Sequence, residues 1–232
     1  MFGDYWAFTS GPTGPGDFDP ACIAEWDFNP SGCLRRVDGA KHCPEDIVHE
    51  VHADGEIWSS ALHDIHLTAG RETTDRIVLQ SHFLVPMFPR FCDGARALRD
   101  ADDLLDGGAN RAAIGGALAS RGIAGDFAVA NFLSTSLDPA THAIHFEIVN
   151  QGNCGVGPAV HRVEQVCADG LPVAPPVEVA TDGLLRGESA IFDLTFAAQP
   201  GSCHYRVSAD AKNEEIETRE DNNIIEGPFV GV

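Results

Sequence analysis

The period of the hydrophobic pattern changes once along the chain, and this change constrains the fold more than any other sequence feature. Up to about Gly122, apolar residues recur at helical spacing between loops. From Gly125 onward they alternate with polar residues, as in half-buried strands. We therefore expect a multidomain α+β chain, mainly helical over residues 1–123, with an antiparallel β-sandwich over residues 125–232.

Several segments of the first part carry the helical pattern. "ADGEIWSSALHDIH" predicts a helix with Asp54 as its N-cap and with Ile57 and Ile65 on its buried face. Further helices are expected in "RETTDRIVLQSHFL", in "FCDGARALRDADDLLDGG", which ends at Gly107, and in "NRAAIGGALASRG", which ends at Gly122.

Three segments of the second part alternate with period two: "HAIHFEIVN", "AIFDLTF" and "CHYRVSADA". Their predicted inward-facing residues are Ile144, Phe146, Ile148, Phe192, Leu194, Phe196, Tyr205, Val207 and Ala209. Turns rich in Gly, Pro and Asn separate these short strands, as is typical of a small sandwich.

The charge of the chain excludes some partners. There are 35 acidic and 15 basic residues, which gives a formal net charge of -20. This charge argues against nucleic acids and anionic membrane surfaces as partners. No apolar run approaches the length that spans a bilayer. The N-terminal "MFGDYWAFTSG" has none of the features of a secretory signal peptide.

None of the seven cysteines belongs to a CxxC pair. They include one group in a loop-rich stretch (Cys22, Cys33, Cys43) and another among the predicted strands (Cys154, Cys167, Cys203). This distribution favours disulfides over a zinc site, and hence an oxidising compartment. The odd count leaves at least one thiol outside the disulfides of this chain, and the pairing stays open.

His49-Glu50-Val51-His52 reads HExH, one residue short of the HExxH zinc helix. Histidines four apart share a helix face, whereas these are three apart and precede the helix-start signal at Asp54. We expect a pair of surface histidines here.

Two acidic stretches raise the question of calcium. The aspartates of "RDADDLLDGG" (Asp100, Asp102, Asp103 and Asp106) do not have EF-hand spacing, so we expect a solvated helix face. In "NEEIETREDNN", Glu217, Asp221 and Asn222 offer oxygen ligands for Ca²⁺, although a polar turn between strands is the simpler interpretation. Signatures of α/β-hydrolases, P-loop NTPases and dinucleotide-binding proteins are absent.

Three stretches in order resemble fungalysin-like zinc metallopeptidases, which are related to thermolysin. "FGDYWA" resembles the segment that follows the third zinc ligand, "VHADGEIWSSAL" the start of a downstream active-site helix, and "ADDLLDGGANRAAIGGALASRGI" the end of the helical C-terminal subdomain. The resemblance covers residues 1–123 and implies peptide-bond hydrolysis by zinc-activated water in a secreted parent protein.

The resemblance also implies roles for individual residues. His52 matches the histidine that donates a hydrogen bond to the oxyanion of the tetrahedral intermediate. Asp4 matches the carboxylate that orients a zinc-binding imidazole. The loop from Cys22 to Cys43 would be an insertion near the cleft.

The zinc ligands themselves are missing, because the third ligand would lie one place before Met1 and the HExxH helix further upstream. Either the reading frame starts at an internal methionine or the chain is a remnant. On both readings we expect the chain alone to be inactive.

The second half resembles a CARDB domain, an immunoglobulin-like module associated with bacterial adhesion. Asn150-Gln151-Gly152 matches the strand that ends Asn-x-Gly. The last-hairpin pattern is approximated by Asp210, Ile216, Glu217, Glu220, Asn222 and Asn223. The alternative to a peptidase fragment is therefore a non-catalytic adhesion or binding protein that uses its sandwich.

Overall fold

The computed structural model describes residues 2–11, 19–24, 32–138, 140–167, 170–197, 203–212, 217, 219 and 221–227. The chain divides into two compact units, residues 1–123 and 124–232. The first is mainly helical and the second is built of antiparallel strands, so the chain has the expected α+β class.

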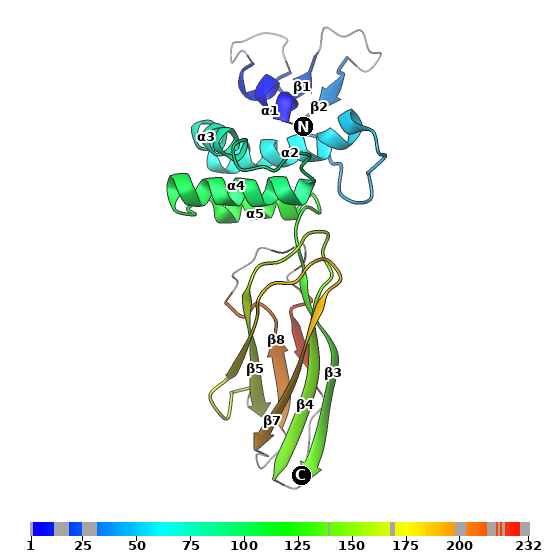
Figure 1. The fold of residues 1–232 in the computed structure, drawn as a ribbon, viewed down its shortest axis with the longest axis vertical. Helices are drawn as coiled ribbons and strands as arrows, with labels where there is room; N and C mark the ends of the chain where they lie inside the picture. The colour runs from blue at the N-terminus through cyan, green and yellow to red at the C-terminus, as the bar shows by residue number, and fades with distance from the viewer. Residues whose placement is uncertain are drawn as a thin grey trace. The chain divides into compact units, whose positions relative to one another are not determined.

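The described part of the first unit consists of five helices and a short hairpin. The helices are α1 (Phe2–Thr9), α2 (Val51–Ala69), α3 (Arg71–Ser81), α4 (Phe91–Asp106) and α5 (Arg111–Ala119). Figure 1 shows α4 and α5 side by side, with α2 and α3 above them. The hairpin pairs β1 (Cys22–Ile23) with β2 (Arg35–Arg36).

The ends of the helices follow from local chemistry. As predicted, α4 ends at Gly107, which adopts the left-handed conformation at φ 63°. Helix α3 ends at Ser81, earlier than expected, and tighter turns follow in which the N–H groups of Phe83 and Leu84 donate to the carbonyls of Gln80 and Ser81. Helix α5 ends at Ala119, three residues before Gly122.

The predicted start of α2 is wrong. The helix begins at Val51 rather than after Asp54, because the side chain of Glu50 accepts hydrogen bonds from the backbone N–H groups of His52 and Ala53. Asp54 lies in the first turn, where Oδ1 accepts from the N–H of Val48 at 2.9 Å. Glutamate is an uncommon N-cap and aspartate is a common one, so the sequence favoured Asp54 over Glu50 as the N-cap.

The core of the helical unit forms where α2 and α4 meet. Trp58 on α2 is fully buried and stacks on Phe91 of α4, with ring centroids 6.2 Å apart. Gly94 on α4 faces the Trp58 ring so closely that a Cβ there would lie 2.6 Å from Cη2. The predicted inward residues of α2, Ile57 and Ile65, are fully buried.

Helix α1 is held against α2 and α3 by one carboxylate and three histidines. The Tyr5 hydroxyl donates to Asp75 Oδ1 at 2.7 Å. The Trp6 indole N–H donates to Nε2 of His82 at 3.2 Å. Ring contacts complete the docking: Phe2 lies 4.1 Å from His82, and Phe8 lies 4.9 Å from both His63 and His66, between centroids.

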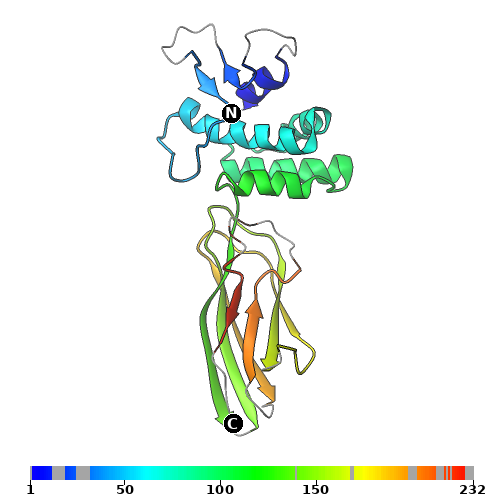
Figure 2. The ribbon, with the colours of Figure 1, turned by 180° about the vertical axis from the view of Figure 1, so that it is seen from behind.

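The second unit is a sandwich of two antiparallel sheets. One sheet has the order β3-β4-β7 and the other β6-β5-β8-β9. The strands are β3 (Phe127–Asp138), β4 (Thr141–Asn150), β5 (Ala159–Cys167), β6 (Val177–Thr181), β7 (Ser189–Ala197), β8 (Cys203–Ser208) and β9 (Ile224–Glu226). Seen from behind in Figure 2, β9 lies beside β8, as their pairing requires.

Side-chain alternation in the sandwich agrees with the predicted period of two. In β4, Ile144, Phe146 and Ile148 are buried, and in β8 Tyr205 and Val207 are buried. The inward residues of β7 are half-buried and pack against the same core.

Asn150 explains the Asn-x-Gly signature at the end of β4. It is fully buried, and its Oδ1 accepts from the N–H groups of Asp126 and Gly152. Its Nδ2 donates to the carbonyls of Cys154 and Leu184. Gly152 is required because a Cβ there would lie 2.6 Å from the backbone nitrogen of Asp126.

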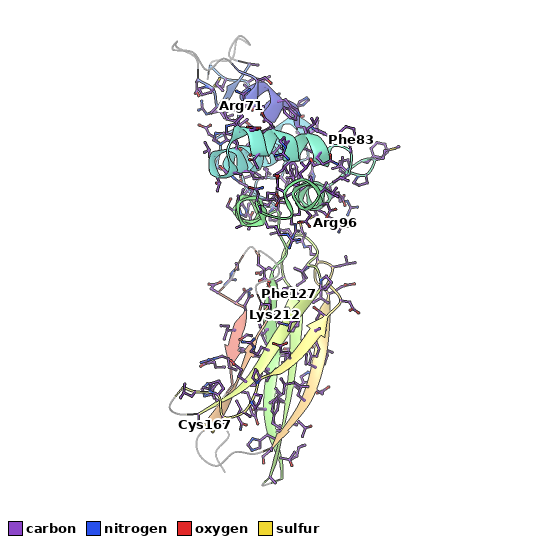
Figure 3. The ribbon with its side chains drawn as sticks, turned by 90° about the vertical axis from the view of Figure 1, so that its left-hand side faces the viewer. Arg71, Phe83, Arg96, Phe127, Cys167 and Lys212 are labelled. Atoms are coloured by element: carbon purple, nitrogen blue, oxygen red, sulfur yellow. A yellow bond between two sulfur atoms is a disulfide. The ribbon has the colours of Figure 1, made fainter. Side chains whose placement is uncertain are left out.

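Disulfides form in both units, as predicted. Cys22 is bonded to Cys33, and Cys167 is bonded to Cys203, its direct partner in the β5–β8 register. Figure 3 labels Cys167 in the sandwich. Cys43 is a thiol. Among the described helices, none has the length and apolar character needed to cross a membrane.

Replacing Gly94 with Ala should destabilise the helical unit by about 1–3 kcal/mol, because the added methyl overpacks Trp58. Gly116→Ala in α5 is the matched control, since a Cβ there meets nothing within 4 Å. The control should be neutral or stabilising by up to about 1 kcal/mol through helix propensity. Urea unfolding of both variants measures this, and equal effects would contradict the proposed contact.

The docking of α1 should weaken in acid. Burial lowers the pKa of His66 and His82 below 6.5, their value in an unfolded chain. Around His66, the Asp75 carboxylate acts against this shift, whereas His63 and Arg71 add to it. The folded state therefore binds fewer protons than the unfolded state, and the free energy of unfolding should fall as the pH drops below about 6.5.

His82→Gln tests this expectation, because glutamine still accepts from Trp6 but cannot become charged. Urea midpoints measured from about pH 7.5 to about pH 5 should depend less on pH in this variant than in the wild type. His49→Gln, at an exposed position, is the control. An unchanged pH dependence in His82→Gln would show that this ring does not contribute.

Candidate functional site

The residues that the sequence marks for chemistry lie on α1 and at the start of α2. Asp4 is on α1 and His52 is in the first turn of α2. Between them in the chain, β2 supplies Arg35, which no sequence motif marks. Glu50, the N-cap of α2, is the fourth member of this group.

Asp4 is engaged by a two-point ion pair. It is 7% exposed, and Arg35 donates from Nε to Oδ2 at 2.9 Å and from Nη2 to Oδ1 at 2.7 Å. The hydrogen bond to Asp4 is the main cause that raises the pKa of Arg35, and the charges of Glu56 and Glu50 raise it further. Arg35 is therefore a fixed cation among three carboxylates.

His52 is positioned by the residue that caps its helix. Its Nδ1 lies 2.8 Å from Oε1 of Glu50, while 70% of its side chain is exposed. The backbone N–H of Ala53 is the main cause that lowers the pKa of Glu50 to about 2, and the hydrogen bond with the His52 ring contributes next. Glu50 therefore stays ionised and orients the imidazole.

The geometry of this pair determines what the imidazole can donate. A neutral ring that donates from Nδ1 to Glu50 has only an acceptor at Nε2. A doubly protonated ring keeps the bond to Glu50 and also donates from Nε2, which forms no hydrogen bond with the described residues. In that form His52 can bind a developing oxyanion at the surface.

Two further residues tie β2 to the start of α2. Glu56 on α2 accepts from the backbone N–H of Arg36 at 3.0 Å and forms an ion pair with Lys41. Lys41 also donates to the carbonyl of Ala53 at 3.1 Å. The elements that carry Asp4 and His52 thus form one connected polar frame.

The HExH stretch does not form a zinc helix. His49 precedes α2, has a positive φ of 62° and is exposed, and Glu50 is used as a cap. Over the ranges that the structure describes, no three His, Cys, Asp or Glu side chains are grouped so that they could hold a metal ion. Zinc therefore has no ligand set among these residues.

The three residues considered for calcium have different surroundings. Glu217 is buried, Asp221 accepts from Arg219 at 3.1 Å, and Asn222 donates to Asp126 Oδ2 at 2.9 Å. Calcium binding by this turn stays a prediction. Ile216 and Glu220 of the hairpin pattern lie outside the described residues.

The expected solvated face of α4 is wrong for one aspartate. Asp102 is fully buried, because its carboxylate accepts from the backbone and the side-chain amide of Asn110 at 2.9 and 2.8 Å. It fixes the turn from α4 to α5. Asp103 pairs with Arg111 and Asp106 with Arg76, so these carboxylates are structural.

The chain is similar to a curated extracellular protein. No protein-family model matches the chain. Extracellular metalloproteinase 2 of Arthroderma gypseum is 25% identical over 134 residues, a match that covers 45% of this chain and 21% of that protein. The chain spans about a fifth of the length of this relative.

Solved structures similar to the chain include two small domains. The CARDB domain of a Pyrococcus furiosus protein, crystallised with di-metal ions, is 20% identical, with a TM-score of 0.38 over 47% of this chain and 89% of that one. A domain of a putative cell surface protein from Methanosarcina acetivorans is 21% identical, with a TM-score of 0.35 over 47% of this chain and 92% of that one. The sequence resemblance to a metallopeptidase is thus matched by a curated relative.

Proposed function

We propose that this chain is the C-terminal portion of a secreted zinc metalloendopeptidase followed by a CARDB-like module. The main support is the polar frame that links Asp4, Arg35 and the Glu50–His52 pair. It sets an anchored carboxylate and an oriented imidazole on one unit, as the resemblance requires. Similarity to an extracellular metalloproteinase supports the same proposal.

The roles of the two residues differ. His52 would donate from Nε2 to the oxyanion that forms at the scissile carbonyl of a protein or peptide substrate. Asp4 would orient a zinc-binding imidazole, and Arg35 would hold Asp4 in place for that task. His52 is thus the catalytic residue, and Asp4 and Arg35 are positioning residues.

The described residues of this chain do not fit zinc as a ligand set. We propose that the ligands belong to sequence upstream of Met1 in the full-length gene. The 232-residue chain by itself should then fold but neither retain stoichiometric zinc nor cleave casein.

The second candidate is a non-catalytic adhesion protein that works through the sandwich. In the peptidase proposal, the same module would hold the secreted enzyme near a surface or a substrate. The genomic DNA separates the two candidates: an HExxH helix and a glutamate codon directly before Met1, in frame, are required for the peptidase. A stop codon or unrelated sequence there would leave only the binding protein.

In the restored full-length protein, His52→Ala should lower kcat on casein about a hundredfold with little change in KM, because the lost interaction exists only in the transition state. His49→Ala removes a neighbouring exposed histidine and should leave both constants unchanged. An increase in KM alone for His52→Ala would reject the role in the transition state.

A further inference from the structure

The segment between α3 and α4 exposes an unusual amount of apolar surface. We define residues 82–90 as the apolar loop. Phe83, Met87 and Phe88 are 78, 84 and 90% exposed. Leu79, near the end of α3, and Leu84, within the loop, are 55 and 37% exposed. Clusters of exposed large apolar side chains mark sites of contact with another molecule.

The backbone of this loop adds a separate observation. Phe88 has a φ of 62°, in the left-handed region that glycine and asparagine prefer. A bulky aromatic residue is therefore held in a disfavoured conformation while its ring faces solvent. Such strain is characteristic of residues kept for function rather than for folding.

Charge near the loop differs in sign from that of the whole chain. Residues 77–99 contain three arginines (Arg90, Arg96, Arg99) and a single acidic residue, Asp93. Asp93 accepts from the backbone N–H of Arg90, and both Arg90 and Arg96 are exposed. The next seven residues, 100–106, contain four aspartates and no basic residue. Figure 3 shows Phe83 and Arg96 on the same side of the helical unit.

We propose that the apolar loop docks this protein on an anionic lipid surface, with Phe83, Met87 and Phe88 inserted among the acyl chains and Arg90 and Arg96 beside the headgroups. Side chains this exposed protrude from the surface, and a bilayer interface accepts protruding apolar groups without a complementary groove. Flanking arginines then gain from the negative surface potential of the lipid. The inference is independent of the proposed peptidase activity.

Vesicle flotation of the full chain tests the proposal. The wild type should bind phosphatidylcholine vesicles that contain phosphatidylglycerol, bind pure phosphatidylcholine vesicles more weakly, and lose affinity as salt is raised. The variant Phe83→Ser/Met87→Ser/Phe88→Ser should lower the partition coefficient about tenfold or more. Arg96→Gln should reduce the preference for the anionic vesicles.

A matched control uses exposed leucines elsewhere in the same unit. Leu67 and Leu104 are 68 and 67% exposed, so Leu67→Ser/Leu104→Ser changes the apolar surface without touching the loop. This variant should bind vesicles as the wild type does. The proposal is overturned if the wild type fails to bind anionic vesicles, or if the loop variant binds equally well. Self-association that depends on the loop, without vesicle binding, would identify a protein contact instead.

Discussion

The hydrogen bond from the Tyr5 hydroxyl to Asp75 anchors α1 on α3, and the placement of Asp4 depends on this contact. Helix α1 has eight residues, too few to be stable alone in water. Burial, and then the Asp75 carboxylate, raise the pKa of Tyr5, so the phenol stays protonated and remains a donor. Thr9, one helical turn further on, donates to the same carboxylate at 2.9 Å. Together with the histidine contacts, this acidic side chain on α3 thereby fixes the helix that carries Asp4.

From Asp4 the ordering continues to the start of α2. Arg35 joins α1 to β2, and the backbone of β2 reaches Glu56 on α2. The Glu50–His52 pair belongs to the first turn of that helix. The position of the imidazole therefore depends on contacts between segments that are distant in the sequence.

This dependence explains which parts could be predicted from the sequence. Helix α4 and its end at Gly107 were predictable because apolar spacing and a left-handed glycine are local signals. The burial of Phe146 was predictable for the same reason. The pairing of Arg35 with Asp4 was not, since it joins residues 31 apart in sequence whose encounter only the fold determines. Burial of Asp102 likewise required a turn that brings Asn110 back to it.

Net charge and local charge describe different aspects of the surface. The formal charge of -20 describes the average field far from the molecule, whereas a partner at contact distance responds to charges within about a Debye length of roughly 8–10 Å. Within residues 82–99 the exposed charged side chains are Arg90 and Arg96. An acidic protein can therefore present a basic surface wherever its carboxylates are gathered elsewhere.

The side chain of Asn150 has a consequence for how the sandwich chooses its strand alignment. If β4 slid by two residues against β3, its apolar side chains would still point inward, so burial alone distinguishes the two alignments poorly. The amide of Asn150 distinguishes them, because only the native alignment brings it to the backbone groups of Asp126 and Leu184. In any slipped alignment this amide would enter the interior with its hydrogen bonds unmade, at a cost of several kcal/mol, about 2–7 for a single such group. One polar residue thus fixes the register of β4 against β3.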